Sequence, residues 1–134
     1  MSNLTARNCR SSLFWSALRL KDLCSLEQII ADIICIDLED AVPPKDKASA
    51  RNALNEFLTT HTPIPNVKYI VRINACDTED GDLDLKMLLE ESRFISYLVI
   101  PKLESLEVLK KVDHQINQYK SPLNLFGIIE TALG

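Results

Sequence analysis

Charged and amide side chains follow four of the short apolar runs in this sequence, where they could assemble a reactive site. They are Asp37, Glu39 and Asp40, then Arg72 and Asn74, then Lys102 and Glu104, and last Glu130. Side chains two residues apart on a strand point to the same face. In parallel α/β proteins, groups at the carboxyl ends of neighbouring strands meet at one edge of the sheet. The pattern therefore predicts one polar centre built from four strands.

The residue types in this set favour a hard cation. Carboxylates without a histidine or cysteine partner suit Mg²⁺, which uses one or two protein carboxylates and keeps water and substrate as its other ligands. Glu130 is the best ligand candidate, followed by Glu104 or Glu39. Arg72 can bind a substrate carboxylate through two parallel hydrogen bonds. A cation and a guanidinium together suit a 2-oxo or 3-hydroxy acid whose carbon–carbon bond breaks or forms through a stabilised enolate.

Two alternatives accompany this interpretation. Lys102 could form a Schiff base with a carbonyl substrate, but the neighbouring acids would keep its amine protonated. A charge just past a strand can also be a helix cap or a solvated loop residue, and Asp40 and Asp46 suit that role. Asp37 and Arg72 lie inside or against apolar runs, where an unpaired charge is costly. These two residues therefore favour a functional site.

The elements that would position these groups alternate between strands and helices. The apolar runs that indicate buried strands are Leu13–Leu18, Ile33–Leu38, Tyr69–Ile73, Tyr97–Ile100 and Leu125–Ile129. Four apolar helix faces lie between them: Leu23, Leu26, Ile29 and Ile30; Ala50, Leu54, Phe57 and Leu58; Leu85, Leu88 and Leu89; and Leu106, Leu109, Val112 and Ile116. We expect Ser105 to cap the last helix, and Asp82 and Asp84 to begin the third. The order predicts an α/β fold with five parallel strands and right-handed crossovers.

Composition narrows the class of protein. The 134 residues are 46% hydrophobic and 25% charged, with a net charge of −4, which is ordinary for a globular domain. This charge gives no electrostatic reason to expect nucleic acid or an anionic membrane as a partner. No apolar run reaches the roughly 20 residues of a membrane span. The four cysteines form no C-x-x-C pair, Cys35 lies in an apolar run as a core residue would, and a reducing cytoplasm is the default location.

The beginning of the chain is basic. Arg7, Arg10, Arg19 and Lys21 occur there before any acidic residue. A mitochondrial transit peptide would have a similar composition. A first strand within Ser11–Leu18 is the alternative, and we favour it because the segment is apolar and short.

Five segments resemble the HpcH/HpaI aldolase and citrate lyase β-subunit family, also called CitE-like. They are RSSLF (Arg10–Phe14), IDLEDAVPPKDKASAR (Ile36–Arg51), VRIN (Val71–Asn74), IPKLES (Ile100–Ser105) and GIIETALG (Gly127–Gly134). The resemblance implies a TIM (β/α)8 barrel, Mg²⁺ as cofactor, and cleavage or formation of carbon–carbon bonds in citryl-CoA, malyl-CoA and related acyl thioesters. It implies an acyl-CoA thioester or a small 2-oxo or hydroxy acid as the partner, and a homo-oligomer, either a trimer or a hexamer, for the full-length form.

The resemblance also implies roles for the matching residues. Glu130 matches a family Mg²⁺ ligand, and Arg72 matches the arginine that binds the substrate's carboxyl or oxo group. Glu39 and Asp40 match acids near the metal, and Lys102 and Glu104 match a pair that touches or surrounds it. We therefore expect Arg72 and Glu39 to be catalytic, Arg72, Asn74 and Lys102 to bind substrate, and Glu130 to bind Mg²⁺, with Glu104, Asp37 and Asp40 in the outer shell of the metal.

The sequence departs from the family pattern in places. The first strand continues as FWSALRLKDL (Phe14–Leu23) rather than as FVPA and a proline-containing loop, and Ile30 replaces a glycine. The family's second metal ligand, an aspartate after the sixth strand, has no counterpart before Gly134. A full barrel needs about 250 residues, so we expect residues 1–134 to be its N-terminal half. The alternatives to a lyase are a truncated non-catalytic remnant and a class II aldolase that acts on free 2-oxo acids.

Overall fold

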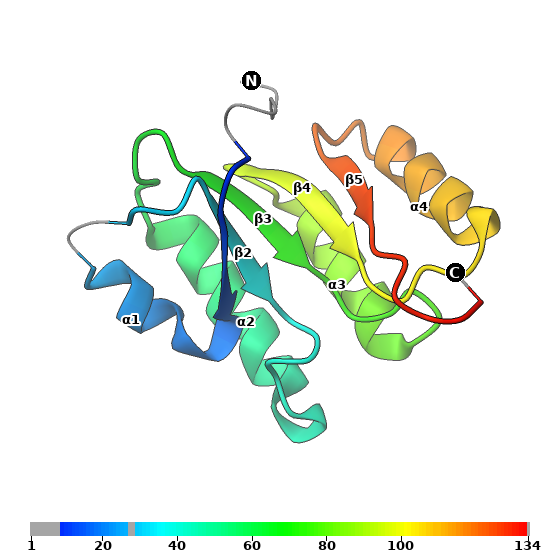
Figure 1. Cartoon of the computed structure of the whole chain (residues 1–134), viewed down its shortest axis with the longest axis horizontal. Coiled ribbons are helices and arrows are strands. Elements are labelled where there is room, and N and C mark those ends of the chain that lie inside the picture. Colours follow the sequence, from blue (N-terminus) through cyan, green and yellow to red (C-terminus); the bar gives the residue numbers. More distant parts are fainter. Residues whose placement is uncertain (1–8, 27–28, 134) are drawn as a thin grey trace.

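The computed structural model describes residues 9–26 and 29–133, and its centre is one parallel sheet. The strands are β1 (Ser12–Ser16), β2 (Ile33–Asp37), β3 (Lys68–Arg72), β4 (Ile95–Ile100) and β5 (Asn124–Gly127). They lie side by side in chain order, β1-β2-β3-β4-β5, and every neighbouring pair is parallel (Figure 1). The predicted α/β fold with five parallel strands is therefore confirmed.

Each connection between strands carries a helix. These are α1 (Leu20–Cys24), α2 (Lys47–Thr60), α3 (Glu79–Glu90) and α4 (Leu106–Gln118), with short 3₁₀ turns at Ala17–Arg19 and Pro44–Asp46. Ser105 caps α4 by accepting a hydrogen bond from the Val108 backbone amide, as the sequence predicts. Across the described ranges, no helix combines the length and the apolar character that a membrane crossing needs.

The two faces of the sheet have different surroundings. The predicted apolar faces of α2 and α3 are buried against one face of the sheet, where they meet strand residues such as Ile34, Val71 and Leu98. The opposite face carries a smaller cluster of Ile33, Cys35, Ile70 and Val99. Strand β2 is buried along its whole length, which explains its uninterrupted run of apolar residues, and Cys35 is the core residue that we predicted.

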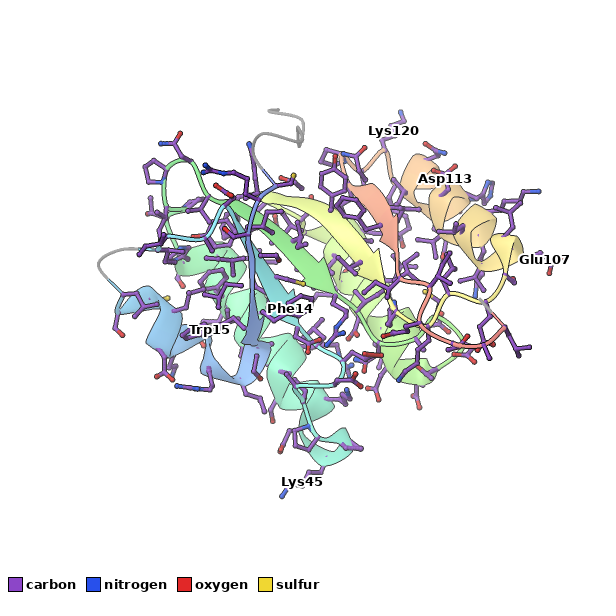
Figure 2. The ribbon with its side chains drawn as sticks, in the orientation of Figure 1. Phe14, Trp15, Lys45, Glu107, Asp113 and Lys120 are labelled. Carbon is purple, nitrogen blue, oxygen red and sulfur yellow. The ribbon has the colours of Figure 1, made fainter. Side chains whose placement is uncertain are left out.

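The open face leaves aromatic side chains exposed. Phe14 in β1 is 50% exposed and Phe126 in β5 is 43% exposed. The Phe126 ring stacks on Tyr97 of β4 with a centroid separation of 4.7 Å. Figure 2 labels Phe14 beside Trp15 on β1; Trp15 packs against the helix-side core, so the two residues alternate between faces as strand neighbours do.

The register between β3 and β4 contains one irregularity. Tyr69 lies opposite Ile95, whereas the next residue of β3, Ile70, lies opposite Tyr97. Ser96 is therefore an extra residue, as in a β-bulge. Because of it, Ile95 contributes to the helix-side core while Tyr97 and Val99 pack with the open face.

The beginning of the chain differs most from the prediction. Strand β1 ends at Ser16 rather than Leu18, because the Ser16 hydroxyl accepts a hydrogen bond from the Leu18 amide and caps a 3₁₀ turn. Helix α1 ends at Cys24, so the expected helical face of Leu23, Leu26, Ile29 and Ile30 is wrong: Leu23 is buried, whereas Ile30 is 96% exposed. The strand that we expected within Ser11–Leu18 is nevertheless present, at residues 12–16.

Two further expectations about helices are only partly right. Asp82 lies in the first turn of α3, as predicted, but the helix begins at Glu79, because Thr78 is its N-cap and accepts a hydrogen bond from the Gly81 amide. Asp84 therefore lies inside the helix, fully buried. On α4, Val112 and Ile116 are buried as predicted, but Leu106 is 63% exposed because it lies in the first turn, before the helix contacts the sheet.

Candidate functional site at the carboxyl ends of the strands

A carboxylate on β2 clamps an arginine on β3. Asp37 accepts hydrogen bonds from Arg72 Nε at 2.9 Å and from Arg72 Nη2 at 2.6 Å, so the two groups form a planar, two-bond pair. The backbone amides of Glu39 and Ala41 donate to the same carboxylate. Burial raises the pKa of Asp37, but the hydrogen bonds from Arg72 and the two amides outweigh it and leave the pKa below its usual range. Asp37 therefore positions Arg72 and has no free lone pair for a metal's outer shell.

Arg72 presents its remaining edge to the open face. Its guanidinium carbon lies 5.0 Å from the centre of the Phe14 ring, and Nη1 lies 3.7 Å from a Glu39 carboxylate oxygen. The hydrogen bonds to Asp37 raise the pKa of Arg72 further, so the group is always charged. An arginine held by one edge can bind a substrate carboxylate with the other.

Glu39 carries an unsatisfied buried carboxylate. The residue is 5% exposed, and within the described residues no hydrogen bond reaches either side-chain oxygen. The nearest cations are Lys102, whose Nζ lies 3.2 Å from Oε2, and Arg72. Burial raises the pKa of Glu39, and the nearby Lys102 opposes this. A buried acid with unused lone pairs fits a group that receives a proton, a substrate hydroxyl or a cation.

Lys102 connects the acids of two strand ends. Its backbone has a φ of 49°, a left-handed conformation that is unfavourable for a lysine. The backbone amide donates to Glu130 Oε1 at 3.0 Å, while Nζ lies 3.2 Å from Glu39 and 3.8 Å from Asp40. Glu39 raises the pKa of Lys102, followed by Asp40 and Glu130, so its amine stays protonated. This supports an electrostatic role for Lys102 over the Schiff-base alternative.

A second network, which sequence reasoning missed, fixes the end of β3. Asp84 of α3 accepts hydrogen bonds from the Asn74 backbone amide at 2.8 Å and side-chain amide at 2.7 Å, and it pairs with Arg51 of α2 at 3.0 Å. Burial raises the pKa of Asp84, and the bonds from Asn74 and Arg51 oppose it. Asn74 also donates to the Leu38 carbonyl, so its amide nitrogen is committed to the protein. The pairing of Asp84 on α3 with Asn74 at the end of β3 depends on how the two elements pack, so no local sequence pattern predicts it.

Lys47 was also missed. Its Nζ donates to the carbonyl oxygens of Leu38 at 2.9 Å and Glu39 at 2.7 Å, and so it holds the turn that carries the acids after β2. Lys47 is the first residue of α2 and follows the 3₁₀ turn at Pro44–Asp46. This turn places its side chain beside the carbonyl groups at the end of β2. Lysines at a helix start ordinarily indicate only a solvated side chain, so no pattern pointed to this contact.

Part of this set lines an open hollow of about 530 Å³, namely Glu39, Asp40, Asn74 and Lys102, together with residues of the connections after β2 and β3. Arg72 and Asp37 lie beside Glu39 and not in the lining of this hollow. Glu104 lines an adjoining hollow of about 310 Å³, which Lys102 shares. Asp40 is exposed, and its side chain contacts Lys102. The strand ends therefore bring Asp37, Glu39, Arg72 and Lys102 together, and the Glu130 carboxylate reaches the Lys102 backbone.

The acids fit part of a magnesium site. Carboxylate oxygens are the ligands that Mg²⁺ prefers, and both Glu39 oxygens lack hydrogen bonds from the described residues, although Oε2 lies 3.2 Å from Lys102 Nζ. Glu130 uses one oxygen on the Lys102 amide and keeps the other. Among residues 9–26 and 29–133, however, no three acidic, histidine or cysteine side chains cluster tightly enough to hold an ion by themselves. Water and substrate oxygens would have to complete the coordination of a bound Mg²⁺.

Five parallel strands with helices packed on one face, and charged groups gathered at their carboxyl ends, define a β/α protein of the TIM-barrel type. The model of the family described as HpcH/HpaI aldolase/citrate lyase matches residues 10–134. The chain belongs to this family.

Named relatives agree with the family. The chain is 35% identical to an L-malyl-CoA/beta-methylmalyl-CoA lyase of Rhodobacter capsulatus over 96% of its own length and 42% of the lyase. It is 33% identical to a citrate lyase subunit beta-like protein of Mycobacterium tuberculosis over 78% of its own length and 33% of that protein. The chain thus spans about a third to two fifths of these relatives.

A solved structure shows the same arrangement of strands and helices. The Mycobacterium tuberculosis citrate lyase beta subunit complexed with oxaloacetate and magnesium superposes with a TM-score of 0.67 at 28% identity, over 96% of this chain and 52% of that one. The described part of the chain therefore has the fold of the matching half of a citrate lyase β-subunit.

Proposed function

We propose that this chain supplies the acid-binding half of an Mg²⁺-dependent carbon–carbon lyase site that acts on a 3-hydroxyacyl-CoA thioester of the malyl-CoA or citryl-CoA kind. The observation that carries the proposal is Arg72, clamped by Asp37 at 2.6 and 2.9 Å beside the unsatisfied carboxylate of Glu39. A fixed guanidinium next to an acid with free lone pairs can bind an anionic substrate and receive a proton from it.

The residues of this chain divide the work of the reaction. The free edge of Arg72 binds the substrate's terminal carboxylate. Glu39 accepts the proton of the 3-hydroxyl group, which becomes a carbonyl as the neighbouring carbon–carbon bond breaks. The electron pair of that bond goes to the thioester fragment as an enolate. Lys102 holds Glu39 in place and adds positive charge where the anions gather.

Mg²⁺, when bound by Glu130 with water and substrate, would polarise the substrate carbonyl and stabilise negative charge on the enolate. Two similar solved structures from Mycobacterium tuberculosis support Mg²⁺ as the cation: one is complexed with oxaloacetate and magnesium, and the other with magnesium, acetoacetate and coenzyme A. The free thiols of Cys9, Cys24, Cys35 and Cys76 fit a reducing compartment such as the cytoplasm.

The binding half of the proposal is tested by titrating the chain with oxaloacetate in a calorimeter, with Mg²⁺ and with EDTA. We expect binding that Mg²⁺ strengthens and that Arg72→Lys weakens by about 1.5–3 kcal/mol, since the two-bond contact to a carboxylate is lost. Arg93→Lys is the matched control, because Arg93 forms only an exposed pair with Glu91. Equal affinity of the Arg72 and Arg93 variants would refute the assignment of Arg72.

The chemical half is tested by incubating the chain with L-malyl-CoA and, separately, with a free 4-hydroxy-2-oxo acid. A lyase would release acetyl-CoA from the thioester with Mg²⁺ and not with EDTA, as measured by mass spectrometry. Cleavage of the free acid alone would favour a class II aldolase instead.

A non-catalytic acid-binding chain is the second candidate. It is favoured by the lack of a three-ligand metal cluster among the described residues. Binding of oxaloacetate that depends on Arg72, without cleavage of either substrate, would support it.

A further inference from the structure

A second group of reactive side chains lies at the other end of the sheet. Cys24 ends α1, which leads into β2, and His61 follows α2, which leads into β3. Both therefore lie at the amino ends of the strands, away from Arg72 and Glu39. The Cys24 sulfur is 3.6 Å from His61 Nδ1, and His61 Nε2 is 3.2 Å from the Tyr69 hydroxyl. Cysteine, histidine and tyrosine thus form one hydrogen-bonded row.

The histidine ring in this row is held rigidly. It stacks on Phe57 with a centroid separation of 4.3 Å and an interplanar angle of 18°, and it contacts Tyr69 and Phe94 edge-on or tilted. Burial lowers the pKa of His61, so the ring is neutral near neutral pH. A fixed neutral imidazole keeps one nitrogen directed at the Cys24 sulfur.

His61 can activate Cys24 in either of its neutral tautomers. The buried Tyr69 hydroxyl accepts a hydrogen bond from the Ile64 backbone amide at 3.2 Å, and it can donate to His61 Nε2 or accept from it. With hydrogen on Nδ1, the ring donates to the Cys24 sulfur and stabilises the thiolate, the nucleophilic form of cysteine. With hydrogen on Nε2, Nδ1 can accept the thiol proton.

A cavity adjoins the same sulfur. It has a volume of about 110 Å³, lies between α1 and α2, and is lined by Ala17, Leu18, Leu20, Lys21, Cys24, Ala53, Glu56, Phe57 and Thr60. Most of its wall is apolar, and Lys21 and Glu56 provide its charged groups. A cavity of this size and character admits a short apolar chain rather than a charged or bulky molecule.

We propose that Cys24 is a covalent modification site for small α,β-unsaturated carbonyl compounds with a short apolar tail. The tail occupies the cavity. The Cys24 thiol gives its proton to His61 Nδ1 or, where Nδ1–H donates to the sulfur, to water. A bond forms between the Cys24 sulfur and the β-carbon, the electron pair of the carbon–carbon double bond moves to form an enolate, and the enolate takes a proton from water. The product is a thioether, and no oxidant or further reactant is consumed. This inference is independent of the lyase proposal.

The test compares two thiols of one chain. Cys9 is also exposed and serves as the internal reference. The chain is treated with acrylamide or with pent-1-en-3-one, and adducts are quantified on each cysteine by peptide mass spectrometry. We expect Cys24 to react about tenfold faster than Cys9 in the folded chain, with a larger ratio for pent-1-en-3-one because its ethyl group occupies the cavity. Using the Cys24-to-Cys9 ratio removes the difference in reactivity between the reagents.

Two variants distinguish activation of Cys24 by His61 from the effect of solvent exposure alone. His61→Gln should lower the ratio toward one for both reagents, whereas Ala53→Leu, which fills the cavity, should lower only the preference for pent-1-en-3-one. Unfolding the wild-type chain in concentrated urea should abolish the ratio and needs no variant. A folded-chain ratio near one, or a ratio that His61→Gln leaves unchanged while the variant remains folded, would overturn the proposal.

Discussion

Asp37 and Arg72 form the buried pair on which the candidate site depends. Their side chains are 2% and 12% exposed, and Asp37 also accepts two backbone amides. Because all lone pairs of the Asp37 carboxylate accept hydrogen bonds, replacing Asp37 leaves several buried donors without an acceptor.

Asp37→Asn is therefore expected to destabilise the chain by about 3–5 kcal/mol, as measured by urea denaturation. The amide would turn an N–H group toward donors that now face an oxygen. Glu91→Gln neutralises an acid in an exposed pair with Arg93 and should change stability by less than about 0.5 kcal/mol. Similar small losses for both variants would show that Asp37 is not essential to the fold.

Glu39 differs from Asp37, because in the part of the chain that the structure describes its buried carboxylate has no hydrogen bond and only two nearby cations, Lys102 at 3.2 Å and Arg72 at 3.7 Å. Its pKa is raised by burial above the ordinary value of 4.5. A raised pKa means that the folded state binds the proton more tightly than the unfolded state. The protonated form therefore favours folding below about pH 4.5, and this contribution is lost as the pH rises through the folded pKa.

Glu39→Gln should consequently match the wild type in acid and exceed it in stability near neutral pH. Urea denaturation at several pH values checks this, with Glu56→Gln as the control. A Glu39→Gln chain that is less stable than the wild type near neutral pH would contradict the prediction.

Residue roles could be predicted only in part. Asp37 and Arg72 were expected at a shared centre because charge inside an apolar run requires a partner, and the structure brings them together. The pattern could not show that Asp37 holds Arg72 rather than surrounding a metal, because either role places an acid on the same face. The roles of Glu39, Asn74, Lys102, Glu104 and Glu130 stay predictions.

The connection between β3 and α3 depends on one glycine. A Cβ atom at Gly81 would lie 2.0 Å from the Ala75 carbonyl oxygen and 2.9 Å from that of Asn74, and both are backbone atoms that cannot move independently. This close approach lets Asp84 reach the end of β3.

Gly81→Ala should destabilise the chain by about 1–3 kcal/mol, although alanine ordinarily favours a helix. Lys86→Ala on the same helix, at an exposed position, should change stability by less than about 0.5 kcal/mol. Thermal or urea unfolding of the two variants distinguishes them. A stabilising effect of Gly81→Ala would mean that the helix can shift without cost.

At the level of elements, the sequence predicted the alternation of strands and helices but not every boundary. Continuous apolar runs identified the five strands because a parallel sheet buries both faces. Helix α1 was overestimated because Leu23, Leu26 and Ile30 have helical spacing, yet the helix ends at Cys24. Thr78 was missed as the cap of α3 because several acids nearby are equally good candidates, and only the contact between Asp84 and Asn74 decides.

The whole molecule has one open sheet face. Phe14 and Phe126 lie on it, half exposed, and within the described residues the outer edges of β1 and β5 have no strand partner. Exposed aromatic side chains next to unpaired strand edges promote association.

We therefore expect the 134-residue chain to sediment as a concentration-dependent mixture of species in analytical ultracentrifugation. Phe126→Lys should shift the distribution toward monomer. Leu106→Lys, which replaces an exposed apolar residue on the helix side, should not. Monomer at every concentration of the wild type would contradict this expectation.

The extra residue at Ser96 adds length to β4 without changing which face its neighbours occupy. Ile95 pairs with Tyr69 on the helix side and Tyr97 pairs with Ile70 on the open side, as two adjacent residues of a regular strand would. Deleting Ser96 should therefore leave Leu98, Ile100 and Lys102 on their present faces. A one-residue deletion within Tyr97–Ile100, where no residue is extra, would instead reverse the faces that follow it and move Lys102 away from Glu39.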